Sequence, residues 1–365
     1  MKVGLLLTPY KEDQVVKQEF VKIIRKRDWL RNVNKKDTIF KKNKKYVTDD
    51  RSIFEYLKEK YGNKHSFVEI SGNDEKIKEK IKKCDIVFLL IFDLLEAYHI
   101  LPERQFKTIK SAYSLPNVYP PYEYQFFINN KNVYYDYLRK KDINVLPFLY
   151  ISSKDFKKNG QACVAKVMKM KRGDDGKFIG KPIYGQESLE FEIFPKNVRA
   201  NKVEKYLERI SKLYSGCVFQ PYLKNFDSIG EYRVFYIGNK RVYCIHTRVE
   251  NGEFKYTLED ENSISKLGKV FEFAEKVFKE LPSFFNGKLE INKLLTRIDI
   301  TCCIENEDKF FVSELEFVPS LYCDRVDHLL VDKKLGEQIK TILDELPEKQ
   351  KVNLSSDCEF VKDYK

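Results

Sequence analysis

The chain has 365 residues, of which 42% are hydrophobic, 14% aromatic and 33% charged, a balance that excludes an intrinsically disordered protein. The most apolar run, at 86–95, is too short to cross a membrane and contains Asp93, so no membrane partner is expected. The formal net charge of +12 suits anionic ligands. The Lys and Arg residues are spread along the chain without a helix-turn-helix or zinc-finger pattern, so nucleic acid is not the expected partner. Charged residues at 11–13 follow closely on the apolar start, which argues against a secretory signal and favours the cytoplasm.

Residues 1–115 alternate strand patterns with helix patterns. Apolar runs at 2–9, 66–71 and 84–92 predict buried strands, and stretches with apolar residues at helical spacing separate them. Strands that alternate with helices predict a small domain of α/β class with a parallel sheet. The segment LPNVYPPYEY, rich in Pro and Asn, marks the predicted end of this domain.

Two α+β units are predicted to follow, at 116–215 and 216–346. The first combines short strand patterns with amphipathic helix patterns. The second contains strand patterns in CVFQPYL, EYRVFYIG and RVYCIHTR, then a helix, then an antiparallel pair in which TRIDITCCIE is joined to KFFVSELEFV. A last helix is predicted up to residue 346, and residues 347–365 are expected to form a polar tail.

The antiparallel pair carries the most informative charged residues. Side chains alternate along a strand, so Arg297 and Asp299 share one face, as do Glu314 and Glu316. Three carboxylates at one site repel one another, and a hard cation such as Mg2+ relieves that repulsion because it prefers oxygen ligands. Spacing alone leaves an alternative open, in which these are solvated strand residues paired with nearby lysines.

The segment RIDITCCIENEDKFFVSELEFVPSLY resembles the last motif block of ATP-grasp enzymes, in the class of D-alanine–D-alanine ligase and glutathione synthetase. In that family an Arg-x-Asp strand pairs with a Glu-x-Asn strand followed by a short loop that contains Pro. The resemblance implies that Asp299, Glu314 and Glu316 bind Mg2+ and that Arg297 stabilises an anionic tetrahedral intermediate. Glu316 departs from the pattern, because it stands where the family usually has Asn.

The segment CVFQPYLKNFDSIGEYRVFYIG resembles the nucleotide hinge of the same family. The resemblance implies that Glu231 takes the ribose hydroxyls and that Arg233 points toward the phosphates or the acceptor substrate. The expected adenine-binding residues are consecutive: Gln220, Pro221, Tyr222 and Leu223. Taken by itself, QPYL also fits an ordinary strand with a Pro at a sheet edge.

Two lysines complete the resemblance. In FIGKPIYGQES, Lys181 matches the ATP-binding lysine of the family, and the residues up to Ser188 match the flap that covers the phosphates. Lys131, in NNKNVYYDYL, matches a second lysine that precedes a helix and reaches the phosphates. A lysine is a compact charge with three donors, which suits a triphosphate, although a chain this rich in Lys has many that are only solvated.

These motifs occur in the family's order between about residues 116 and 325. They imply an ATP-grasp fold, in which a small N-terminal parallel-sheet domain precedes two α+β subdomains that sandwich ATP. They also imply an ATP- and Mg2+-dependent ligase that joins a carboxylate to an amine through an acyl phosphate, with small-molecule, peptide or protein substrates. Two alternatives stay open: an inositol polyphosphate kinase, which suits the +12 charge, and a non-catalytic protein that binds nucleotide or nucleic acid. The sequence leaves the substrates and the oligomeric state unspecified.

Overall fold

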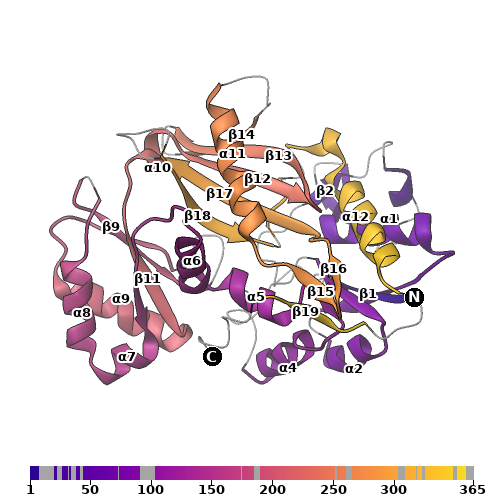
Figure 1. The fold of residues 1–365 in the computed structure, drawn as a ribbon, viewed down its shortest axis with the longest axis horizontal. Helices are drawn as coiled ribbons and strands as arrows, with labels where there is room; N and C mark the ends of the chain where they lie inside the picture. Colours follow the sequence, from indigo (N-terminus) through magenta and orange to yellow (C-terminus); the bar gives the residue numbers. More distant parts are fainter. Residues whose placement is uncertain are drawn as a thin grey trace.

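The structure is a computed structural model that describes most of the chain (Figure 1). The described residues are 1–7, 20–22, 27–31, 33, 38–41, 44–72, 74–90, 103–173, 175–184, 190–250, 253–259, 265–302, 309–317, 319–322, 325–347 and 352–358. No helix among them is long and apolar enough to span a membrane.

The N-terminal region contains the predicted parallel sheet. Its strands lie in the order β5 (Ser66–Ser71), β1 (Lys2–Leu7), β6 (Ile86–Leu89) and β7 (Val118–Tyr119), and all three pairings are parallel. The helices of this region are α1 (Asp49–Tyr61), α2 (Ile77–Lys82) and α4 (Glu103–Tyr113). The inner strand β1 has five consecutive buried residues, as expected for a strand with both faces covered. The lysine-rich stretch before α1 also contributes a small antiparallel sheet of β2 (Phe20–Lys22), β4 (Lys44–Thr48) and β3 (Ile39–Lys41).

The central region carries a second, antiparallel sheet. Its strand order is β10 (Glu192–Phe194), β9 (Phe178–Pro182), β11 (Gly216–Pro221) and β8 (Leu149–Ser152). The helices are α5 (Tyr122–Asn129), α6 (Lys131–Lys140), α7 (Ser153–Lys158), α8 (Gly160–Lys169) and α9 (Ala200–Leu213). Phe178, Phe219 and Tyr206 of α9 form the core between one face of this sheet and its helices. Gly180 allows this close approach, because a Cβ there would lie 2.8 Å from the Tyr206 ring.

The third and largest sheet lies in the C-terminal region. Its strand order is β14 (Glu253–Glu259), β13 (Lys240–Glu250), β12 (Glu231–Ile237), β17 (Leu295–Cys302) and β18 (Phe310–Glu316). The helix α11 (Ser265–Glu280) packs against one face, where Tyr236 stacks on Phe278. The short helix α10 (Asn225–Ser228) precedes β12. The predicted antiparallel pairing of TRIDITCC with KFFVSELE is confirmed by the β17–β18 ladder.

The helix α12 (Val331–Glu345) returns the chain to the N-terminal region and packs against α1. A buried ion pair fixes this contact, because Arg27 Nε donates to Asp332 Oδ2 at 2.8 Å. Ser52 Oγ of α1 donates to the same oxygen at 2.5 Å. Loss of one partner of such a pair would leave an uncompensated buried charge, which is strongly destabilising.

Part of the predicted polar tail is folded, which corrects that expectation. Residues Leu354–Ser356 form β19, which pairs with β15 (Phe284–Asn286), and β16 (Leu289–Ile291) completes this small sheet. The physical reason is the apolar side chains within the polar segment, because Val352 and Cys358 are fully buried. The domain boundaries stay a prediction, although β7 at 118–119 joins the N-terminal sheet from beyond residue 115.

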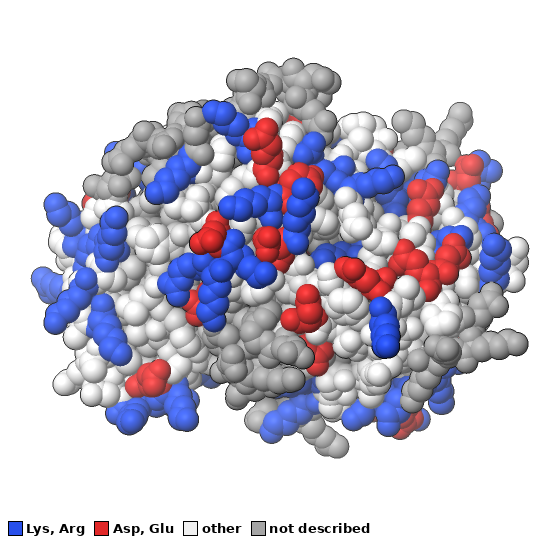
Figure 2. Space-filling view, viewed as in Figure 1, with Lys and Arg blue, Asp and Glu red and all other residues white. Residues whose placement is uncertain are grey.

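Figure 1 shows how these parts are arranged. The β8–β11 sheet with α7, α8 and α9 lies at the left, the β12–β18 sheet in the middle, and β1, α1 and α12 at the right, while α6 stands between β11 and β18. Figure 2 shows that Lys and Arg side chains predominate at the left end on this face. The junction between the central and C-terminal sheets brings the predicted site residues together.

Candidate active site

Three carboxylates gather on the face of the large sheet that α11 leaves open. Register pairs Asp299 of β17 with Glu314 of β18, and Arg297 with Glu316. One oxygen from each of Asp299, Glu314 and Glu316 lies within 4.8 Å of the others. Asp299 and Glu316 are buried and Glu314 is half-buried, so the alternative of solvated strand residues is excluded. The faces predicted from strand alternation are therefore those that the fold presents.

Arg297 holds two of these carboxylates in place. Its Nε and Nη2 donate to the two oxygens of Asp299, both at 2.7 Å, and Nη2 also donates to Glu316 Oε1 at 2.7 Å. The guanidinium is itself buried, so this bidentate pairing occurs away from bulk water, where it is strongest. Arg297 thus compensates part of the negative charge that the strand pair concentrates.

A second arginine lies on the neighbouring strand. Arg233 of β12 is paired in register with Asp299, and its Nε lies 3.1 Å from Glu231 Oε1 and 3.8 Å from Asp299 Oδ2. Its Nη1 donates to the hydroxyl of Tyr322, a residue with a positive φ of 54° in the loop after β18. Arg233 therefore joins the carboxylate cluster to the loop that follows Pro319.

A β-bulge adds a main-chain acceptor to the site. The register of β17 and β18 shifts between Asp299 and Ile300, which leaves Ser313 without an opposite residue. The carbonyl oxygen of Ser313 accepts a hydrogen bond from Tyr135 Oη at 2.6 Å and lies 3.5 Å from Lys181 Nζ. The Ser313 hydroxyl donates to Glu231 Oε2 at 2.5 Å. Sequence reasoning missed Ser313 and Tyr135, because a bulge is a property of strand pairing that no local pattern indicates.

Both predicted lysines reach this cluster from the central region. Lys131 begins α6, and its Nζ lies 2.8 Å from Glu314 Oε1. Lys181 lies on β9, and its Nζ donates to Tyr135 Oη at 2.8 Å. Burial lowers the pKa of Lys181, and the charge of Glu314 opposes that effect. Neither lysine is a solvated surface residue, so the two sheets share one polar site.

The acids of the site differ in their proton affinity. Burial raises the pKa of Glu316 to about 8 against the attraction of Arg297, with the charges of Glu314 and Asp299 acting in the same direction as burial. Burial likewise raises the pKa of Asp299 to about 6. Burial acts the same way on Glu314, but Lys131 and Lys181 outweigh it and hold its pKa at about 2. On the Glu316–Asp299 side of the cluster, burial therefore outweighs the attraction of Arg297 and Arg233.

The fold of the chain is similar to the folds of several solved ligases and synthetases. The D-alanyl-alanine synthetase A of Vibrio cholerae O1 has a TM-score of 0.60 at 14% identity, covering 94% of this chain and 99% of its own. A D-alanine–D-alanine ligase from Bacillus anthracis complexed with ATP has a TM-score of 0.56 at 14% identity, covering 94% of this chain and 97% of its own. The ATP-grasp ligase PsnB, complexed with a minimal precursor, has a TM-score of 0.50 at 16% identity, covering 80% of this chain and 95% of its own.

The chain has the ATP-grasp fold. No protein-family model matches the sequence, and no curated protein matches it. At 14–16% identity the likeness shows the fold and leaves the reaction open. The α/β class predicted from the sequence is confirmed, because one parallel sheet occurs with antiparallel sheets.

In this ATP-grasp fold, the predicted hinge residues lie at the end of β11. Gln220 is paired in register with Ile179, so its side chain shares a sheet face with Lys181, two residues further along β9. The side-chain nitrogen of Gln220 is buried and makes no hydrogen bond of ordinary length and angle in the part of the chain that the structure describes. The Gln220 side chain still lies near enough to the Tyr135 hydroxyl to offset part of the rise in the pKa of Tyr135 that burial causes. A buried donor without an acceptor is costly, and a ligand that supplies an acceptor there would satisfy it.

The rest of the hinge lies beside α10. Tyr222 Oη donates to Asp227 at 2.7 Å, and Leu223 packs against Leu146 and Phe311. Pro221 ends β11, where it faces Phe178 in register. Nucleotide binding by Gln220, Pro221, Tyr222 and Leu223 stays a prediction, and Ser188 lies outside the described residues.

Glu231 lies beside the carboxylate cluster. Its two oxygens accept from Arg233 and from Ser313, and its charge raises the pKa of Asp299. This position beside Asp299 places a fourth carboxylate at the margin of the cluster. The ribose role stays a prediction.

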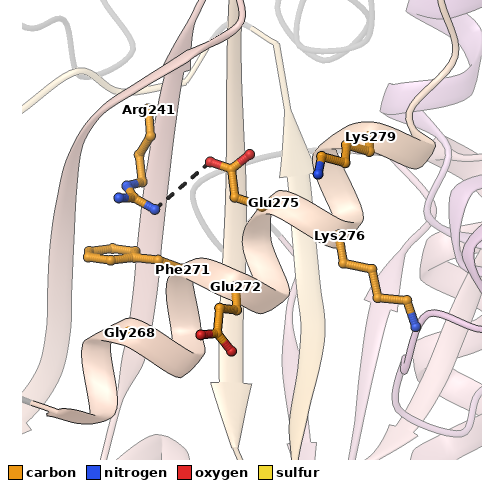
Figure 3. Close-up of a pocket in the computed structure, with 7 residues that line it drawn as sticks. All are labelled: Arg241, Gly268, Phe271, Glu272, Glu275, Lys276 and Lys279. Atoms are coloured by element: carbon orange, nitrogen blue, oxygen red, sulfur yellow. Dashed lines mark ion pairs between the residues drawn. The ribbon is translucent and has the colours of Figure 1, made fainter.

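A surface pocket elsewhere on the sheet has a different character. It encloses about 630 Å³ along α11 and is lined by Arg241, Gly268, Phe271, Glu272, Glu275, Lys276 and Lys279. Figure 3 shows Arg241 above Phe271 with an ion pair to Glu275. Because α11 covers the face opposite the carboxylates, this pocket is separate from the candidate active site.

Proposed function

We propose that this protein is an ATP-dependent ligase that joins a carboxylate to an amine through an acyl phosphate. The observation that carries the proposal is the buried cluster of Asp299, Glu314 and Glu316 beside two lysines of the neighbouring sheet. The ligases among the structural neighbours supply the reaction class, and one of them is a complex with ATP.

The carboxylate cluster fits Mg2+ on chemical grounds. All of its donors are oxygens, which a hard cation prefers, and one oxygen from each of the three carboxylates lies within 4.8 Å of the others. Asp299, Glu314 and Glu316 would hold the ion, which would supply the charge that neutralises phosphate oxygens. Glu316 stands where the family usually has Asn, and it would add a negative charge for the cation once it loses its proton, with a pKa of about 8.

The basic side chains of the site fit a triphosphate. We assign Lys131 and Lys181 to phosphate oxygens, because Lys131 Nζ lies 2.8 Å from Glu314 and the charge of Lys181 acts on the same carboxylate. We assign the buried amide of Gln220 to an acceptor on the nucleotide. These contacts fix the position of the transferred phosphoryl group, which is the main task of a protein in phosphoryl transfer.

The arginines serve the acyl-transfer half of the reaction. Nε and Nη2 of Arg297 already donate hydrogen bonds to Asp299 and Glu316. We therefore assign Nη1 as the donor to the anionic intermediate. Arg233, which reaches both the cluster and Tyr322, is assigned to the substrate that lies beyond the phosphates. Removal of one such donor typically lowers a rate by about 100- to 1,000-fold. We place this ATP-dependent reaction in the cytoplasm.

The test is phosphate release from ATP with Mg2+, measured separately with an amino-acid pool that includes dipeptides and with a pool of inositol phosphates. Wild type is compared with Asp299→Asn and with Asp28→Asn, an equally small change at an exposed ion pair with Arg31. The ligase proposal predicts free phosphate that depends on the amino-acid pool, loss of that release in Asp299→Asn, and retention in Asp28→Asn. ATP consumption without free phosphate in the inositol phosphate pool would instead assign a kinase, and absence of nucleotide binding would overturn both.

A further inference from the structure

An aromatic strip extends from the candidate active site to the edge of the large sheet. The strip consists of Tyr322, Tyr256 and Phe254. The ring centroids of Tyr322 and Tyr256 lie 5.3 Å apart, and those of Tyr256 and Phe254 lie 6.5 Å apart. Its inner end contacts the site directly, because the Tyr322 hydroxyl accepts a hydrogen bond from Arg233.

The strip lies on the same face of the sheet as the carboxylates. Register places Tyr256 opposite Thr247, and Thr247 opposite Glu231 of the cluster. Residues opposite each other in a ladder point to the same face, and Phe254 shares that face because it lies two residues before Tyr256. The face that carries the chemistry therefore continues without interruption to the outermost strand, β14.

Packing does not account for the outer end of the strip. Phe254 is 67% exposed, whereas Tyr256 and Tyr322 are partly buried against the core. The residues on either side of it, Glu253 and Lys255, point to the opposite face and are charged, as is usual on an edge strand. Phe254 is not an isolated surface ring, because it ends a contiguous row of aromatic rings that begins at Arg233, and such a row offers an apolar binding surface.

We propose that the aromatic strip binds an aromatic side chain of a peptide substrate while the reacting group of that peptide lies at Arg233. This inference rests on the proposed ligase function and names its substrate class. Phe254 lies two ring-to-ring steps beyond Tyr322, so the substrate must be longer than one small amino acid to reach it. Offset or edge-to-face ring contacts would supply the affinity, and the charged cluster would orient the reacting end.

The kinetic test compares matched dipeptides in the phosphate-release assay. The probes are Ala-Phe and Phe-Ala against Ala-Ala, with wild type, Phe254→Ala, Phe254→Tyr and Leu289→Ala. Leu289 is a matched control, because it is an apolar residue with 42% exposure on β16, outside the large sheet. We expect the KM for the better aromatic dipeptide to rise about three- to tenfold in Phe254→Ala with kcat unchanged. Phe254→Tyr, which keeps the ring, and Leu289→Ala are expected to match wild type, and Ala-Ala is expected to be insensitive to all three changes.

A binding measurement separates this inference from the ligase proposal. Calorimetry with ADP and Mg2+ present reports dipeptide affinity without turnover. Preferential binding of an aromatic dipeptide that weakens in Phe254→Ala would support the strip even if no phosphate were released. Equal binding of Ala-Phe, Phe-Ala and Ala-Ala, absence of binding by all three, or equal binding by wild type and Phe254→Ala would overturn it. Sedimentation that shows a wild-type dimer and a Phe254→Ala monomer would also overturn it, because a second copy would then cover the ring.

Discussion

The two faces of the large C-terminal sheet, which contains β14, β13, β12, β17 and β18, bury different kinds of residues. On the α11 face, Ile298, Ile300 and Val234 are fully buried among apolar neighbours. On the opposite face the same strands carry charged residues, and Arg297 and Asp299 are almost as buried. The first face is stabilised by burial of apolar surface, whereas the second is stabilised only because acids and bases compensate one another. One set of strands therefore provides a structural face and a chemical face.

Removal of the Arg297 guanidinium should cause the largest loss of stability and activity on the chemical face. Arg297→Ala leaves Asp299 and Glu316 buried without their bidentate partner, so we expect a loss of about 3–5 kcal/mol in the free energy of unfolding. Activity should fall below detection. Denaturant unfolding measures the free energy of unfolding, and a separate phosphate-release assay measures the activity. An Arg297→Ala protein as stable as wild type would contradict the compensation that we describe.

The structural face should respond in stability alone. Ile298→Ala, on the residue between Arg297 and Asp299, removes a fully buried side chain and should lower the free energy of unfolding by about 2–4 kcal/mol. We expect kcat of the folded fraction to stay within about twofold of wild type, because the side chain points toward α11. If Ile298→Ala instead abolished kcat at full stability, the division between the faces would be wrong.

The sequence predicted the chemical face better than the site around it. Arg297, Asp299, Glu314 and Glu316 could be assigned to shared faces because the alternation of strand side chains is a local property. The bulge at Ser313 and the hydroxyl of Tyr135 depend on the pairing of distant strands, so no local signal indicates them. The lysines at 131 and 181 were predicted by motif resemblance, whereas their convergence on Glu314 needed the packing of two sheets.

The ends of the fold show the same limit. The parallel sheet of the N-terminal region follows from its apolar runs, because buried strands have a clear sequence pattern. Three-residue strands such as β19 have no periodicity, and the polar composition of 347–365 concealed the apolar side chains that fold against β15. The strip ending at Phe254 was likewise not apparent, because an alternating edge strand looks the same whether its apolar face is covered or exposed.

The pH dependence of metal binding gives a smaller and more selective effect. A carboxyl group must lose its proton before it binds Mg2+, and burial raises the pKa of Glu316 to about 8 and that of Asp299 to about 6. Affinity for Mg2+ should therefore increase as the pH rises, by about 30-fold between pH 6.5 and 8.5. Glu316→Gln should bind Mg2+ more weakly and with a shallower pH dependence. Calorimetric titrations with Mg2+ across this range would measure the effect, and parallel profiles for the two proteins would contradict it.

The central claim is that the carboxylate face binds a metal–nucleotide complex, and ATP affinity with and without Mg2+ tests it most directly. Calorimetry on wild type, Asp299→Asn and Asp28→Asn separates the site from general charge effects, because each variant loses one carboxylate of the same size. We predict that Mg2+ strengthens ATP binding by at least about tenfold in wild type and Asp28→Asn, with little or no gain in Asp299→Asn. Equal gains in all three proteins, or no gain in wild type, would contradict the account.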